Sequence, residues 1–107
     1  VKKAAIQKIK ALKKAFTINI LKNKDQVTGY QISYSYKKNF KGQKVKDLKK
    51  FKYKKIKVKR KKYTIVSYKV KGLKRKKTVY VRVRAYKQVG KTKVYGKWSS
   101  VKKVKIK

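Results

Sequence analysis

The sequence contains no cysteine and no histidine. Without cysteine, the chain can form no disulfide, no thiol nucleophile and no thiolate metal site. Without histidine, it lacks the usual general base and the commonest metal ligand. We therefore expect a protein that is not an enzyme, with no catalytic, cofactor-binding or metal-binding residues.

Acidic residues are almost absent, because only Asp25 and Asp47 stand against 39 lysines and arginines, for a net charge of +37. Each aspartate lies in a lysine-rich turn-like or edge segment, and nothing in the sequence brings the two together. We interpret both as solvated residues. A surface of one sign attracts anionic partners such as nucleic acid, sulfated glycan, anionic lipid or teichoic acid. In the alternative interpretation, lysine only keeps the domain soluble.

Long apolar runs and proline are also missing, and no segment has the length that spans a membrane or the pattern of a signal peptide. The chain begins at Val1 without methionine, which suggests a module cut from a longer protein. Its 107 residues suffice for a single domain, residues 1–107, with a modest core.

The sequence does contain short runs in which apolar and polar residues alternate. Such runs, rich in valine, isoleucine, threonine and tyrosine, are typical of half-buried strands. We expect strands in the segments 5–10, 15–20, 29–36, 55–60, 63–70, 79–86 and 101–107. Glycines lie between these runs or at their start, and short runs that recur at roughly ten residues suit an antiparallel sandwich. Within the lysine-dense segment 37–62 we expect an edge strand and a neighbouring strand.

The N-terminal segment 1–16 is ambiguous. Its apolar residues recur at intervals of three and four, as in a basic amphipathic helix, which would suggest membrane binding. These residues are Ala5, Ile6, Ile9, Leu12 and Phe16. The later strands need a first strand to complete a sheet, so we favour a strand at residues 5–10.

Alternation also predicts which side chains enter the core. In the segment 29–36, the inner face carries Tyr30, Ile32, Tyr34 and Tyr36, and the outer face carries Gln31, Ser33 and Ser35. In the segment 79–86, the inner face carries Val79, Val81, Val83 and Ala85, and the outer face carries Tyr80, Arg82, Arg84 and Tyr86.

The segments TGYQISYS (28–35) and YVRVRAYKQVGKTKVYGKWS (80–99) resemble a fibronectin type III domain. The closest likeness is to the lysine-rich versions in surface and secreted proteins of Gram-positive bacteria. The resemblance covers nearly the whole chain and implies an all-β fold, a seven-stranded antiparallel β-sandwich of the immunoglobulin-like class. It implies that Leu73 packs beneath the corner that precedes the segment 79–86. The chain departs from the family at Ile20, where a core tryptophan is common, and at Val79, where the corner tyrosine is displaced by one place to Tyr80.

Only four basic residues are arginine, and two of them, Arg82 and Arg84, lie near the only tryptophan, Trp98. The segment YGKWSS (95–100) resembles the tryptophan–serine element of many type III modules, in which tryptophan stacks between arginines. The resemblance implies such a ladder here, and a planar guanidinium stacks on a ring better than a hydrated ammonium does. In the alternative, Trp98 joins Tyr80 and Tyr86 in an aromatic platform for sugars or unpaired bases. We favour the ladder.

The candidate binding residues for a polyanion or an aromatic ligand are the cations and rings of this region. They are Arg82, Arg84, Trp98, Tyr80, Tyr86, Lys87, Lys91 and Lys93. The GKT triplet at 90–92 lacks the upstream glycine and following helix of a phosphate-binding loop, so we interpret it as a loop between strands. Nucleic-acid signatures are missing too, so any binding to DNA or RNA should depend on phosphate contacts and on salt.

The sequence thus predicts a non-enzymatic module of an extracellular, secreted or cell-wall-associated protein, acting as a spacer or adhesion unit. Its dispersed lysines would bind anionic polymers non-specifically: teichoic acid, glycosaminoglycan or extracellular DNA. Neighbouring domains of a longer chain are further expected partners. Three alternatives stay open: a structural repeat or assembly subunit that charge keeps soluble, a cationic effector acting on membranes or nucleic acids, and an engineered, highly charged variant of such a domain.

Overall fold

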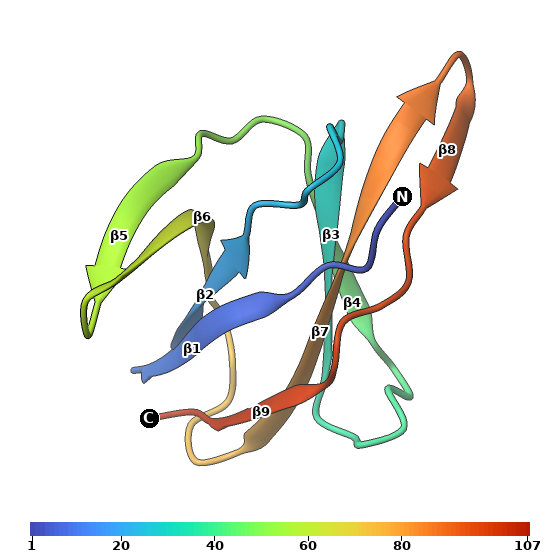
Figure 1. Cartoon of the computed structure of the whole chain (residues 1–107). Coiled ribbons are helices and arrows are strands. Elements are labelled where there is room, and N and C mark those ends of the chain that lie inside the picture. Colours follow the sequence, from blue (N-terminus) through green and yellow to red (C-terminus); the bar gives the residue numbers. More distant parts are fainter.

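The computed structural model describes all residues, 1–107, and contains nine β-strands and no helix (Figure 1). The strands are β1 (Ile6–Leu12), β2 (Ala15–Leu21), β3 (Gly29–Ser35), β4 (Lys44–Leu48), β5 (Lys54–Val58), β6 (Lys61–Val70), β7 (Thr78–Val89), β8 (Thr92–Tyr95) and β9 (Lys102–Lys105). All pairings between them are antiparallel. No helix of the chain has the length and apolar character needed to cross a bilayer.

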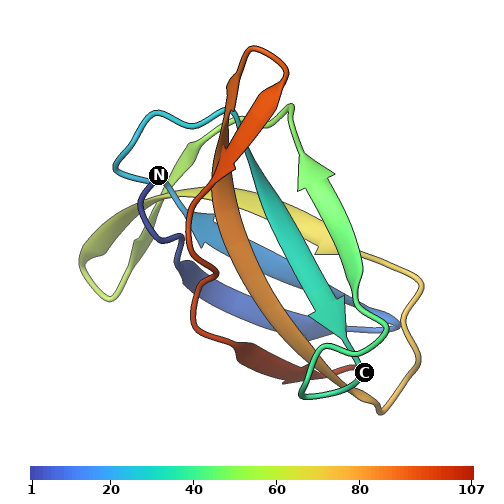
Figure 2. The same cartoon turned by 90° about the vertical axis from the view of Figure 1, so that its right-hand side faces the viewer.

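The strands form two sheets that face each other as a β-sandwich (Figures 1 and 2). The first sheet has the order β1–β2–β6–β5. The second sheet has the order β4–β3–β7–β8, and β9 also pairs with β7. The long strand β7 therefore supports two short strands in succession, since residues 86–89 pair with β8 and residues 78–81 pair with β9.

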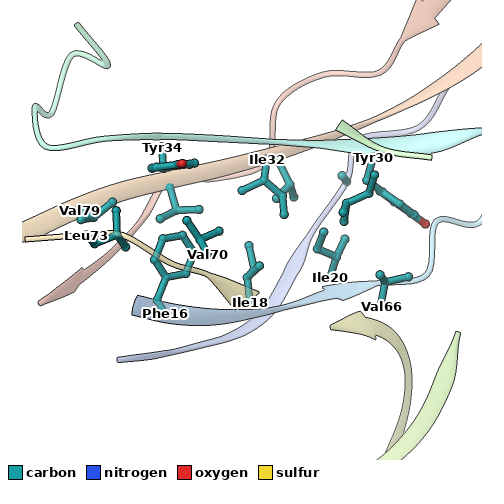
Figure 3. Close-up of a cluster of buried hydrophobic side chains, with 14 of the residues drawn as sticks. Phe16, Ile18, Ile20, Tyr30, Ile32, Tyr34, Val66, Val70, Leu73 and Val79 are labelled. Carbon is teal, nitrogen blue, oxygen red and sulfur yellow. The ribbon is translucent and has the colours of Figure 1, made fainter. Parts of the chain in front are cut away.

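The core lies between the sheets and is a cluster of 16 buried residues. Figure 3 shows Phe16, Ile18 and Ile20 of β2 pointing toward Ile32 and Tyr34 of β3. The four β7 residues predicted to face inward are fully buried: Val79, Val81, Val83 and Ala85. Leu73 is buried in the same cluster. The all-β sandwich and its alternating core are therefore as predicted.

The structure has nine strands where the resemblance implies seven. One difference is β5, which forms a separate edge strand of the first sheet. The other is the final strand, which is divided into β8 and β9 because the segment 96–101 leaves the regular ladder. Within that segment, Gly96 still donates its N–H to the Ala85 carbonyl at 2.8 Å and Ser99 donates to the Val83 carbonyl at 2.7 Å.

The opening strand is confirmed, because β1 covers Ile6–Leu12 where residues 5–10 were expected. The prediction that Tyr36 enters the core is wrong, since its side chain is 42% exposed. The strand ends at Ser35, and the chain turns before Tyr36 can continue the alternation. The Tyr36 hydroxyl instead accepts a hydrogen bond from the Lys74 N–H at 3.0 Å.

The outer face of β3 is polar, as predicted, but it is covered rather than solvated. Its residues Gln31, Ser33 and Ser35 are all buried. The loop after β3 folds back over them, so that the Ser33 hydroxyl donates to the Gln43 side-chain oxygen and the Ser35 hydroxyl donates to the Lys41 carbonyl at 2.7 Å. Burial of these hydroxyls is tolerated because each has a hydrogen-bond partner.

The two-residue turn between β5 and β6 has an unusual backbone. Lys59 and Arg60 both have positive φ, at 49° and 71°. A left-handed conformation costs a residue with a Cβ atom roughly 1–2 kcal/mol. The turn between β7 and β8 avoids this cost, because its left-handed residue is Gly90, at φ 60°. The β1–β2 turn carries the same cost at one residue, Lys14, at φ 53°, so the β5–β6 turn is distinguished by two such residues in succession.

Stability should depend steeply on salt. The folded surface of 7690 Å² carries a net charge of +37, so neighbouring charges lie roughly 14 Å apart, beyond a Debye length of about 8 Å at physiological salt but within one of about 30 Å at 0.01 M. We expect the melting temperature, followed by circular dichroism, to rise by on the order of 10 °C between 10 and 300 mM NaCl. Equal osmolarity of sucrose is the control for solvent effects. If the melting temperature did not change with NaCl concentration, repulsion between the positive charges would not reduce the stability of the fold.

Candidate functional site: an arginine–aromatic ladder on the second sheet

Five side chains stack in a line across the outer face of the second sheet, in the order Phe40, Arg82, Trp98, Arg84 and Tyr95. The Arg82 guanidinium carbon lies 4.0 Å from the Phe40 ring centroid and 4.5 Å from the Trp98 ring. The Arg84 guanidinium carbon lies 4.3 Å from Trp98 and 3.8 Å from Tyr95. The predicted stacking of Trp98 between two arginines is confirmed, and Phe40 and Tyr95 extend this ladder at its ends.

The ladder is assembled from three places in the sequence. Alternation on β7 places Arg82 and Arg84 on one face, residues 95–98 supply Tyr95 and Trp98, and the loop between β3 and β4 supplies Phe40. Ser99 fixes that segment, because it donates its N–H to the Val83 carbonyl at 2.7 Å and its hydroxyl accepts the Val83 N–H at 3.0 Å. One buried serine thus replaces a regular strand pairing and sets the height of the indole above β7.

Neutral amides hold the guanidinium groups in plane. The Gln31 side-chain oxygen accepts a hydrogen bond from Arg84 Nε at 2.9 Å. The Gln43 side-chain oxygen accepts one from Arg82 Nη2 at 3.1 Å. Arg82 Nε is enclosed without a hydrogen-bond partner. Burial, and then the positive charge of Arg84, lower the pKa of Arg82 below its usual range, although an arginine remains charged at neutral pH.

Tyr86 was predicted to face solvent, and this is wrong, because its side chain is fully buried. Its hydroxyl donates to an Asp47 carboxylate oxygen at 2.6 Å. The Tyr95 ring packs against it at 5.9 Å between centroids, and Lys93 Nζ lies 4.9 Å from its centroid. A Cβ atom at position 29 would collide with the Tyr86 hydroxyl, so glycine is required where β3 passes this ring.

Asp47 is exposed, as its setting suggests, but its carboxylate also makes contacts within the chain. Besides accepting from Tyr86, it forms an ion pair with Lys93 at 3.1 Å, which joins the edge strands β4 and β8. Burial alone raises the pKa of Asp47, but the hydrogen bonds from Tyr86 and Lys93 and the charges of Lys93 and Lys49 lower it by more, so the net shift is downward. The other aspartate, Asp25, accepts a hydrogen bond from the Lys2 N–H at 2.8 Å.

The structure brings five of the eight predicted binding residues together in two contacting groups. Arg82, Arg84 and Trp98 belong to the ladder, and Tyr86 and Lys93 lie beside its Tyr95 end. The remaining three are separate: Tyr80 is half-buried opposite Lys103 of β9, and Lys87 and Lys91 are exposed on the β7–β8 hairpin. A flat aromatic platform of Trp98, Tyr80 and Tyr86 does not form, because the Tyr86 ring is covered.

No protein-family model and no curated protein matches this sequence. Twelve solved chains do match it in structure. One of them, described as "Myokine structure", superposes with a TM-score of 0.67 over 98% of this chain and 96% of its own, at 16% sequence identity. At that identity the likeness shows the fold alone.

Replacing Trp98 with alanine should destabilise the fold. The indole stacks on two guanidinium groups and is half-buried, so its loss should lower the free energy of unfolding by about 2–4 kcal/mol. Urea unfolding followed by circular dichroism measures this. Unchanged stability, together with lost binding to a single-stranded oligonucleotide, would instead show that Trp98 binds a ligand and does not stabilise the fold.

A second variant tests the arginines of the same ladder by keeping their charge and removing their planar guanidinium groups. In Arg82→Lys/Arg84→Lys the net charge stays at +37, but an ammonium stacks less well and cannot reach the amides in the same fork geometry. We expect a loss of about 1–3 kcal/mol. Equal stability of this double variant and the parent would show that stacking geometry contributes nothing.

Asp47→Asn should reveal a pH-dependent contribution to stability. A carboxyl whose pKa is lowered on folding stabilises the protein above its unfolded pKa of about 3.9, and this stabilisation is lost as pH falls through the lower folded value. The variant should therefore be less stable than the parent by about 1–3 kcal/mol at pH 6, and the two should converge near pH 2. Asp25→Asn removes the same charge and serves as the control. A constant gap across this pH range would contradict the assignment.

Proposed function

We propose that this chain is a fibronectin type III-like module of an extracellular, secreted or cell-wall-associated protein, and that it binds anionic polymers without catalysis. The observation that carries the proposal is the placement of charge. Every lysine is exposed except Lys93, which is half-buried. Both carboxylates are engaged by hydrogen bonds within the chain, so no acidic patch opposes an approaching polyanion.

Two features support the type III assignment. β1, β2 and β6 share one sheet, and β4, β3, β7 and β8 share the other, which is the arrangement that the resemblance implies, with β5 as an additional edge strand of the first sheet. The Trp98–Ser99 element lies against the arginines of β7, which is the arrangement that the resemblance implies.

The binding mechanism would be collective. Each lysine that approaches an anionic group releases condensed counterions, and the affinity sums over many weak contacts. No shaped pocket is needed for this, and the ligand need not have a fixed sequence or linkage. In this proposal, the ladder keeps the sheet rigid, and exposed lysines on every strand meet the polymer.

The chain ends favour a spacer role in series with other domains. The C-terminal residue Lys107 donates to the Leu12 carbonyl at 3.2 Å and accepts from the Lys14 N–H at 2.9 Å, beside the β1–β2 turn. Near the other end of the chain, the Lys2 carbonyl accepts from the Asn23 side chain at 2.9 Å, at the opposite end of β2. The termini thus lie at opposite ends of the sandwich (Figure 1), and modules joined there would form an extended, self-repelling array.

Binding should be strong at low salt and should fall steeply as salt rises. We expect micromolar or tighter affinity for purified wall teichoic acid, heparin and duplex DNA at 50 mM NaCl, with log K falling linearly against log [NaCl] at about 0.9 per phosphate contacted for the duplex. Isothermal titration calorimetry over a salt series measures both quantities, with neutral dextran as the negative control. No detectable binding to any of the three polyanions at 50 mM NaCl would refute the proposal.

A further inference from the structure

The β5–β6 hairpin concentrates more cations than its size accounts for. In its nine residues 54–62, seven side chains are basic and all seven are exposed: Lys54, Lys55, Lys57, Lys59, Arg60, Lys61 and Lys62. We call this segment the basic hairpin. Its tip projects from the body of the sandwich, away from the second sheet, in both views (Figures 1 and 2).

The cations of the basic hairpin lie on both of its faces. Side chains alternate along a strand, and residues directly opposite each other share a face. Lys57 lies opposite Lys62, on the face that also carries Lys55. Lys61 lies opposite Val58, on the face that also carries Lys54. The second face also carries Ile56, Val58 and Tyr63, so it is less positive than the first. With Lys59 and Arg60 at the tip, the ribbon has cations on both faces and at its end.

The cations and the turn residues of the basic hairpin destabilise the hairpin itself. Like charges directly opposite each other, as at Lys57 and Lys62, destabilise a strand pair. A two-residue turn with both φ values positive strongly prefers Asn-Gly, yet it holds Lys59 and Arg60. The chain uses glycine at the corresponding strain in the β7–β8 turn. Single lysines with positive φ also occur at Lys14 and Lys76, but only this turn has two such residues in succession. Strain in two successive residues points to a function at that place.

The two-sided charge selects among polyanions. A single polymer chain, such as teichoic acid or a glycosaminoglycan, runs along one side of a ribbon. The major groove of B-DNA has an anionic backbone on each side and is about 12 Å wide, which admits a two-stranded β-ribbon. We propose that the basic hairpin enters the major groove of duplex DNA and contacts the phosphates of both strands. This inference rests on the polyanion binding proposed above and names its preferred ligand.

Most contacts are independent of DNA sequence, because they go to phosphates; Arg60 at the tip is the exception, since arginine also pairs with guanine O6 and N7. Lysine ammoniums bind phosphate oxygens as point charges. The residues that pair bidentately with adenine, asparagine and glutamine, do not occur in the segment 54–62. Arg60 at the tip reaches deepest into the groove, where it meets whichever base edges or phosphates the site presents.

The decisive variant is Lys59→Asn/Arg60→Gly, which gives the turn its preferred residues. It removes two charges from the tip, so affinity for a 20-base-pair duplex at 0.15 M NaCl should fall by about tenfold or more and the salt slope should decrease by about 1.8. Its melting temperature should rise, because the strain is relieved. If the turn had only a structural role, its relaxation would raise the melting temperature without lowering the affinity for duplex DNA. Fluorescence anisotropy and thermal melts measure them on the whole chain.

The matched control is Lys8→Gln/Lys10→Gln, which removes two exposed charges from β1. We expect less than about a threefold loss of duplex affinity, since these residues lie outside the groove contact. Equal losses in the two double variants would overturn the inference and leave dispersed polyanion binding intact.

If the unmodified protein bound no polyanion at all, both the proposed function and this inference would be wrong. Lys57→Gln/Lys62→Gln removes two charges from one face of the basic hairpin without altering its turn. We expect a loss of duplex affinity similar to that of the tip variant, and an unchanged affinity would contradict the inference.

Groove occupancy is tested chemically. A bound hairpin should protect guanine N7, which lies in the major groove, from methylation by dimethyl sulfate. The minor-groove ligand netropsin should not compete. The tip variant should also lose more affinity for duplex DNA than for heparin or single-stranded DNA, because these ligands contact one face. Unprotected guanine N7 with competition by netropsin would place the protein elsewhere on the duplex and reject the hairpin insertion.

Discussion

Two carboxylates for 39 cations is the constraint on which this fold depends. Ion pairs cannot organise the surface, and the structure has one, between Lys93 and Asp47. Cations close to the sheet are held instead by aromatic rings and neutral amides, as Arg84 is by Trp98, Tyr95 and Gln31. A ring attracts a cation without adding a charge that must be desolvated. In the ladder, aromatic rings and amides therefore take the place of carboxylates as the partners of surface cations.

The same constraint links folding to binding. Compaction raises the density of positive charge, so the folded chain gathers more counterions than the expanded one and releases more of them to a polyanion. A ligand that binds the folded state more tightly than the unfolded state stabilises the fold by mass action. A polyanion would thus act on this module both as a partner and as a stabiliser, which makes high charge compatible with a modest core.

Alternation predicted the core because one face of each strand is buried over its whole length, as in the valines of β7. It failed at Tyr36 and Tyr86, whose exposure depends on where a strand stops and on which distant segment covers the ring. The central stack of the ladder followed from the resemblance in residues 95–100. Its Phe40 end could not be predicted, because a left-handed loop residue carries no periodic signal. Tyr95 stands only three residues before Trp98, and that spacing is a signal that could have been used.

The two projecting hairpins hold their cations in different ways. On the β7–β8 side, Lys93 lies over the Tyr86 ring and pairs with Asp47, and the turn is relaxed by Gly90. On the β5–β6 side, exposed cations face each other across a turn that strains its residues. Local rules are usually broken at functional sites, where a gain elsewhere offsets the loss. No ring or carboxylate of the chain contacts Lys59 or Arg60, and the proposed duplex DNA contact would supply an anionic partner on both sides of the ribbon.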